Sequence, residues 1–154
     1  MTHINATGPK ASHQFQINSV LMGKVHMRYY FAKILPLGFE EAVRHTTEAL
    51  KQQGFGIISE IDVKQTLKSK IGVDFRNYRI LGACNPKLAH EALQLEDKIG
   101  TMLPCNVVVQ EVDSNSTEIA AIDPVASMAA VDNPRLKEAA HRVQALLKKA
   151  IDAL

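Results

Sequence analysis

The apolar positions of this chain recur with two periods, one typical of strands and one of helices. Short runs rich in β-branched and aromatic residues predict five strands, and apolar residues at offsets of three, four and seven predict amphipathic helices. The predicted strands are Met27–Leu35, Phe55–Ile61, Tyr78–Cys84, Asn106–Val112 and Thr117–Ile122. The predicted helices are Phe39–Gln53, Val63–Ile71, a segment from Pro86 that Gly100 ends, a short segment from Pro124, and Pro134–Ala153.

Helix boundaries in the sequence carry clear local signals. Asn85-Pro86, Asp123-Pro124 and Asn133-Pro134 each pair an N-cap residue with a proline that suits the first helical position. Asp62 predicts another cap, and Gly54 predicts a left-handed helix end. These signals divide the chain into short elements joined by short loops.

The two faces of the first predicted strand differ in polarity. One carries Tyr29, Phe31 and Lys33, and the other carries Tyr30, Ala32 and Ile34. The second set is the more apolar toward the end of the strand. We therefore expect Tyr30, Ala32 and Ile34 to face the core.

The stretch from Tyr78 to Glu111 holds both cysteines of the chain. Each is followed by an asparagine and lies within two residues of a proline, in the sequences Cys84-Asn85-Pro86 and Pro104-Cys105-Asn106. If the two flanking strands are parallel neighbours, the thiols lie at opposite edges of the sheet. A strand of seven residues spans roughly 23 Å. If the strands are antiparallel, both thiols lie at one edge, beside a helix N-terminus that favours a thiolate.

Two interpretations of these cysteines remain open. Cysteine is often a small buried apolar residue, and packing alone explains both positions. The functional interpretation is a ligand or thiol site made by Cys84, Asn85, Cys105 and Asn106. A structural zinc site needs four ligands with a C-x₂₋₄-C spacing, which the chain lacks. A metal would need His90, Glu91, Asp74 or a second copy, so the metal and any cofactor stay unknown.

Catalytic motifs give no support for a known enzyme class. The chain has no G-x-S-x-G, Walker-type, G-x-G-x-x-G or H-E-x-x-H sequence. His90 lies six residues after Cys84, too far along a helix to favour a Cys–His nucleophile pair. Whether the protein is an enzyme is therefore left open.

Composition and charge narrow the range of partners. The 154 residues suit one domain, predicted over 26–154, after a flexible polar tail at 1–25. A net charge of +2, with basic and acidic residues interspersed and no tryptophan, argues against nucleic acid. The chain shows neither a signal-peptide pattern nor an apolar run of roughly 18 residues, so we expect no membrane contact and a cytoplasmic protein.

The strings I-L-G-A-C-N-P and L-P-C-N-V-V-V, with Gly54–Asp62 before them and Ala120–Pro124 after them, resemble the domain of unknown function 302 family. The resemblance covers roughly Met27 to Leu154. It implies a TATA-binding-protein-like α+β fold, with a mainly antiparallel five-stranded sheet backed by helices, a long C-terminal helix, and frequently a dimer. It implies no settled activity.

Two hypotheses follow. The first is a cytoplasmic ligand-, metal- or thiol-redox-linked binding protein centred on the two cysteines. The second is a homodimeric interaction module with structural cysteines, whose dimer uses the face or edge of the sheet around Tyr30 and Ile34.

Overall fold

The structure is a computed structural model and describes residues 28–154. The predicted tail at 1–25 and Met27 lie outside the described residues, so the domain boundary stays a prediction. The strands are β1 (Tyr30–Leu35), β2 (Gly56–Asp62), β3 (Tyr78–Cys84), β4 (Cys105–Asp113) and β5 (Ser116–Ile122). The helices are α1 (Phe39–Gln52), α2 (Val63–Ile71), α3 (Pro86–Leu95), the 3₁₀ turn η1 (Ile99–Met102), α4 (Pro124–Ser127) and α5 (Pro134–Asp152).

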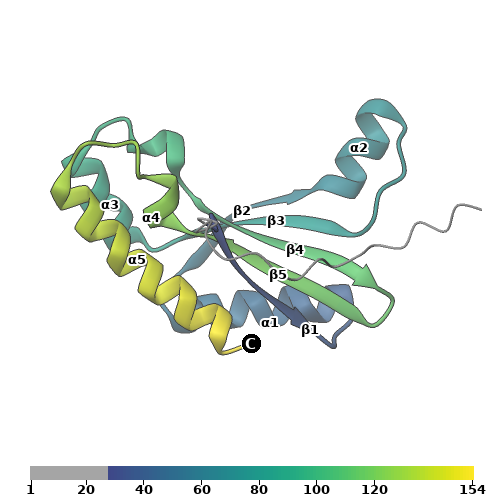
Figure 1. The fold of residues 1–154 in the computed structure, drawn as a ribbon. Helices are drawn as coiled ribbons and strands as arrows, with labels where there is room; N and C mark the ends of the chain where they lie inside the picture. The colour runs from purple at the N-terminus through teal and green to yellow at the C-terminus, as the bar shows by residue number, and fades with distance from the viewer. Residues whose placement is uncertain (1–27) are drawn as a thin grey trace, which may run out of the picture.

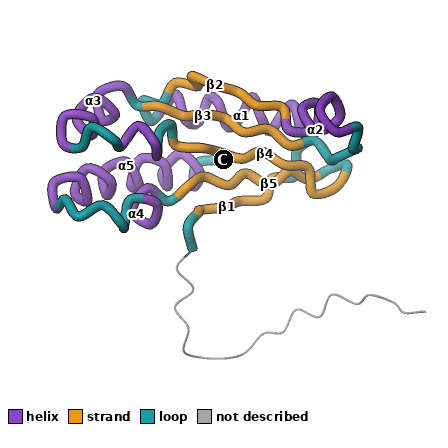
Figure 2. Tube along the Cα trace, turned by 90° about the horizontal axis from the view of Figure 1, so that it is seen from above, coloured by secondary structure: helices purple, strands orange, loops and turns teal. Residues whose placement is uncertain are grey.

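The five strands form one sheet in the order β1-β5-β4-β3-β2, and every neighbouring pair is antiparallel (Figure 2). The α+β architecture, the antiparallel sheet and the long C-terminal helix predicted above are all confirmed. The β4–β5 hairpin turns at Ser114 and Asn115, where the Asp113 carboxylate accepts a hydrogen bond from the Asn115 amide at 2.8 Å. The pKa of Asp113 is lowered mainly by its hydrogen bond with the Ser116 side chain, and to a smaller extent by this bond with the Asn115 amide.

Helices α1 and α5 pack on one face of the sheet, α3 and α4 lie at one end, and α2 projects at the other end (Figure 1). The main core fills the space between the sheet and α1 with α5. Its buried residues are Leu35, Ala42, Leu50, Phe55, Leu81, Ala83, Cys105, Val107, Val109, Ile119, Ala121, Leu147, Ala150 and Ile151. A second cluster, Ala92, Ile99, Met128, Leu136 and Ala140, joins α3, η1, α4 and α5. No helix among residues 28–154 has the length and apolar character needed to cross a membrane.

The prediction for the core face of β1 was wrong. Phe31 packs against the core and Leu35 is buried, whereas Ala32 and Ile34 are exposed. Lys33 lies on the same helix-facing side of β1 as Phe31 and Leu35. Its ammonium group donates hydrogen bonds there to the backbone oxygens of Asp152 and Leu154, at the C-terminal end of α5. A cation is stabilised at that end of a helix dipole, so the polar residue is tolerated there.

The cap prediction was confirmed. The side chains of Asp62, Asn85, Asp123 and Asn133 accept backbone hydrogen bonds at the starts of α2, α3, α4 and α5. The third helix is shorter than predicted, because it ends at Leu95 rather than near Gly100. The Asn133 amide donates to the Leu95 carbonyl at 3.1 Å and satisfies this early end, while Gly100 lies in η1.

Gly82 lies where β3 comes very close to the side chains of Pro104 and Ser59. It lies in β3 opposite Asn106 of β4 and Ser59 of β2. A Cβ at Gly82 would lie 2.7 Å from Cγ of Pro104 and would also collide with the Ser59 hydroxyl. The hydroxyl can rotate away, whereas the proline ring cannot. Only glycine therefore lets β3 pass under Pro104.

We predict that Gly82→Ala lowers the free energy of unfolding by about 1–3 kcal/mol, the usual cost of overpacking. Gly100→Ala is the matched control, because a Cβ at Gly100 meets no atom within 4 Å. The control should stay within about 0.5 kcal/mol of the parent in urea denaturation. Equal stabilities of the two variants would contradict this account of Gly82.

Candidate functional site

The antiparallel pairing of β3 with β4 brings both cysteines to one edge of the sheet. Ala83 lies directly opposite Cys105, so Cys84 ends one strand where Cys105 begins the next. This confirms the antiparallel alternative. The edge is followed at once by α3, whose N-cap is Asn85.

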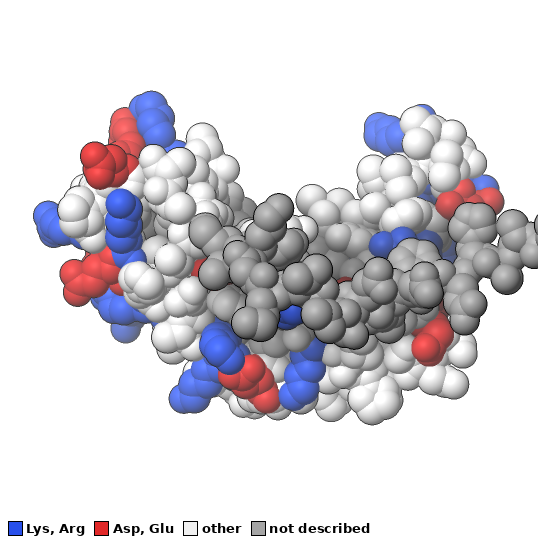
Figure 3. Space-filling view, in the orientation of Figure 1, with Lys and Arg blue, Asp and Glu red and all other residues white. Residues whose placement is uncertain are grey.

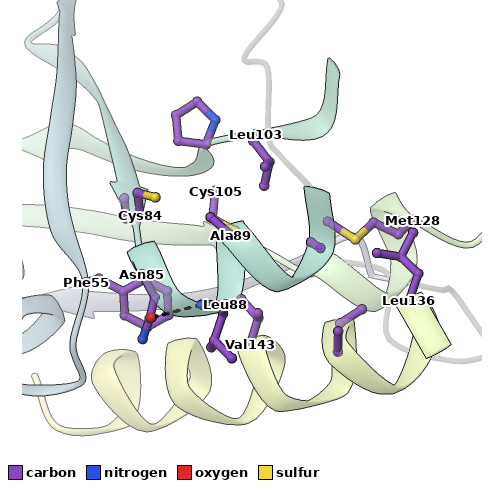
Figure 4. Close-up of a pocket in the computed structure, with 15 residues that line it drawn as sticks. Phe55, Cys84, Asn85, Leu88, Ala89, Leu103, Cys105, Met128, Leu136 and Val143 are labelled. Carbon is purple, nitrogen blue, oxygen red and sulfur yellow. Dashed lines mark hydrogen bonds between the residues drawn. The ribbon is translucent and has the colours of Figure 1, made fainter. Parts of the chain in front are cut away.

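An apolar cavity of about 30 Å³ lies behind this edge, between the sheet, α3, α4 and α5 (Figure 4). A cavity needs at least about 10–15 Å³ to hold one water, so this space suits a guest of a few atoms at most, or a larger one that extends into the mouth. Its lining includes members of both hydrophobic clusters and the first turns of α3. The lining residues are Phe55, Ala83, Cys84, Asn85, Leu88, Ala89, Ala92, Leu103, Pro104, Cys105, Met128, Leu136, Ala139, Ala140 and Val143.

Cys105 is the buried thiol of the site, with an exposed fraction of 6%. Burial raises the pKa of Cys105 from its usual value near 9 to about 11, and the nearby Cys84 adds a smaller effect in the same direction. The thiol is therefore neutral at physiological pH. A neutral buried thiol is a poor nucleophile and a poor metal ligand.

Cys84 is half-buried at the rim of the cavity. It precedes the N-cap of α3, and Ala89 is the fourth residue of that helix. An apolar pair at these two positions is the hydrophobic staple that fixes how a chain enters a helix. Packing therefore accounts for Cys84 without any reaction.

The structure does not join the two cysteines as a pair. Both thiols are free. Cys105 lies opposite Ala83 rather than Cys84 in the register, so the two cysteines are not cross-strand partners although both line the cavity. The thiol-pair interpretation has no support in this arrangement.

The two asparagines of the predicted site separate. Asn85 lines the cavity, and its side-chain oxygen accepts a hydrogen bond from the Leu88 amide at 3.3 Å, as predicted for a cap. Asn106 is exposed on the opposite face of the sheet, because it follows Cys105 in β4. Of the four predicted site residues, the cavity therefore brings together Cys84, Asn85 and Cys105, and excludes Asn106.

The residues named as additional metal ligands lie elsewhere. Glu91 pairs with Arg142, Asp74 pairs with Lys68, and His90 is exposed. Residues 28–154 contain no group of three or more His, Cys, Asp or Glu side chains placed to hold a metal ion.

Sequence reasoning missed most of the cavity wall. Phe55, Met128 and Leu136 come from segments far from the cysteines in sequence. Leu136, Ala139, Ala140 and Val143 recur at helical spacing within the predicted helix Pro134–Ala153, a stripe that the sequence predicts to cover the sheet. No local signal indicates that this stripe leaves a space against α3.

We predict a pH dependence from Cys105. Because its pKa is raised in the folded state, its contribution to stability is complete below pH 9 and is lost as the pH rises through 11. Relative to Cys105→Ala, the parent should lose about 2 kcal/mol of unfolding free energy between these two pH values. Urea denaturation at several pH values measures this, and parallel curves for the two proteins would contradict it.

Comparison with known proteins agrees with the architecture. The family model described as "Domain of unknown function DUF302" matches residues 31–154. The crystal structure of an uncharacterized conserved DUF302 protein from Bacillus stearothermophilus aligns with a TM-score of 0.74 and 30% sequence identity, over 80% of this chain and 96% of that chain. A comparison with curated proteins finds no match. The chain therefore belongs to the DUF302 family.

Proposed function

We propose that this protein is a binding protein for a small neutral apolar molecule, which occupies the cavity behind the Cys84–Cys105 edge. The observation that carries the proposal is the composition of the wall. Apart from Asn85 and the two thiols, every lining side chain is a hydrocarbon or a thioether. Small-molecule sites are mostly apolar, with few polar groups.

The state of the polar groups supports a neutral guest. The Asn85 oxygen is already used to cap α3, and the Cys105 thiol is neutral because of its burial. Burying an ion here would cost far more free energy than its interactions with these groups would supply. The metal-linked and redox-linked alternatives are therefore set aside in favour of non-covalent binding.

We also propose that the protein is located in the cytoplasm. Both cysteines are free thiols, the state that the cytoplasm maintains.

We predict that benzene binds at the cavity with part of its ring in the mouth, because the enclosed space of about 30 Å³ is too small for the whole ring. Ala89→Leu should lower the affinity for benzene at least about tenfold by filling the mouth. Ala89 is half-buried and lines the cavity, so a larger side chain fits there at modest cost. Ala145→Leu, at an exposed position of α5, is the matched control and should bind like the parent. Methyl chemical shifts in NMR titrations measure the binding.

Retained binding by Ala89→Leu, or shift changes in residues remote from the cavity, would show that benzene binds elsewhere. A parent protein that shows no change at saturating benzene would contradict the proposal itself.

A second candidate function, homodimerisation, is favoured by the difference between the two sheet edges. Edge β2 is interrupted by a bulge between Ile57 and Ser59, a common device against further pairing. Edge β1 pairs with β5 through six consecutive residues without a bulge. Its side chain Ile34 is 59% exposed. We propose that β1 pairs with β1 of a second copy about a two-fold axis.

We predict that Ile34→Lys converts the dimer to a monomer, because it places two like charges beside a two-fold axis. Ile71→Lys, in the projecting α2, alters an equally exposed isoleucine away from this edge and should stay dimeric. Sedimentation velocity distinguishes the two states. A monomeric parent, or a dimeric Ile34→Lys protein, would rule out this interface.

A further inference from the structure

A shallow hollow lies on the face of the sheet that α1 and α5 do not cover. It has a volume of about 290 Å³ and is separate from the cavity, which opens on the helix side. Its wall combines aromatic, aliphatic and polar side chains from four strands and the segment before β1. They are Tyr29, Tyr30, Tyr78, Asn106, Val108, Gln110, Glu118, Ala120 and Ile122.

The register explains why these residues meet. Tyr78 of β3, Gln110 of β4, Glu118 of β5 and Ile34 of β1 form one cross-strand row. The neighbouring row is apolar on all five strands, with Ile61, Ile80, Val108, Ala120 and Ala32 in order. The one carboxylate of the hollow therefore lies beside an apolar row.

Glu118 is the unusual member of this surface. It is half-buried, and its Oε2 accepts a hydrogen bond from Nε2 of Gln110 at 2.6 Å. The Gln110 oxygen in turn accepts from Nε and Nη2 of Arg76, at 3.1 and 2.7 Å. Arg76 itself stacks over the Phe75 and Tyr78 rings. Within the described part of the chain Glu118 forms no ion pair.

A half-buried carboxylate among apolar side chains is stabilised by a cation that is desolvated with it. The surrounding rings add to this preference. Tyr29 and Tyr30 pack edge to face, 4.9 Å apart, and give the hollow an aromatic surface on which the apolar body of such a cation can lie. Aromatic rings and one carboxylate together are the chemistry that recognises an organic cation.

We propose that this hollow binds a small organic amine, a primary ammonium group on an apolar or aromatic body, with Glu118 as the anionic partner. The ammonium group contacts the Glu118 carboxylate, and the body lies on the tyrosine rings and on Val108 and Ala120. The volume of the hollow is close to the lower end of the range for small-molecule sites, which favours a compact guest. The sheet that carries the hollow runs between two raised ends of the molecule, one formed by α2 and the other by α3 and α4 (Figure 1).

The distribution of charge elsewhere supports a local site of this kind. Figure 3 shows acidic and basic side chains mixed on both raised ends, without an extended face of one sign in the part of the surface that it describes. Long-range attraction of a cation is therefore weak, and recognition depends on Glu118 itself.

The test uses the full chain and two probes of matched shape, 2-phenylethylamine and 2-phenylethanol, titrated at low salt and followed by amide NMR shifts. The amine should bind about tenfold more tightly than the alcohol, with shifts centred on Asn106, Gln110 and Glu118. Glu118→Gln should lower the affinity for the amine about tenfold, the effect of one charged hydrogen bond. Glu48→Gln, which removes an exposed charge from α1, should leave it unchanged.

Equal affinities for amine and alcohol, an unchanged amine affinity in Glu118→Gln, or no binding of the amine at saturating concentration would each overturn the proposal. The site does not depend on the benzene cavity, because the two lie on opposite faces of the sheet. Failure of one proposal therefore leaves the other unaffected.

Discussion

The antiparallel pairing of β3 with β4 is the constraint on which the rest of this structure depends. It places Ala83 opposite Cys105, so the end of one strand and the start of the other form a single edge. Gly82 permits this pairing to pass beneath Pro104, where a Cβ would not fit. The N-terminus of α3 then begins at the same edge, with Asn85 as its cap. The cavity proposed as a binding site lies behind this edge.

Two hydrophobic clusters meet at that edge without filling the space between them. One belongs to the sheet with α1 and α5, and the other to α3, η1, α4 and α5. Protein interiors are normally packed to crystal-like density, so a cavity at such a junction costs stability. A bound apolar guest would offset that cost, so binding of such a guest is energetically favoured. The uncovered face of the sheet, unlike the cavity, carries a chain of polar side chains. Arg76 donates a hydrogen bond to Gln110, and Gln110 donates one to Glu118.

Local signals predicted the helices and strands well because they act within a few residues, whereas the antiparallel pairing was implied by the family resemblance. The Asx-Pro signatures placed the starts of α3, α4 and α5, and alternation with turn residues placed all five strands. The side of β1 could not be predicted in this way. Lys33 has its hydrogen-bond acceptors at Asp152 and Leu154, at the far end of the sequence. Only tertiary structure shows that a lysine on the helix side of the sheet is satisfied.

The candidate site was predicted only in part for the same reason. The motifs around Cys84 and Cys105 left two sheet arrangements open, and only the antiparallel one puts both cysteines at one edge. The asparagine after each cysteine has a different environment. Asn85 caps a helix beside the cavity, whereas Asn106 continues a strand and points to the other face. Apolar wall residues such as Phe55 and Met128 carry no motif and are recognised only once the helices are placed.

The central claim is that the space between the two hydrophobic clusters is a binding site for an apolar guest. Crystallography under xenon pressure tests it most directly, because xenon enters empty apolar cavities and is visible without any assumption about the natural ligand. The account predicts a xenon atom within van der Waals distance of the Cys105, Leu88 and Val143 side chains. Xenon bound only at other positions, or side chains that close the space in the measured structure, would contradict it.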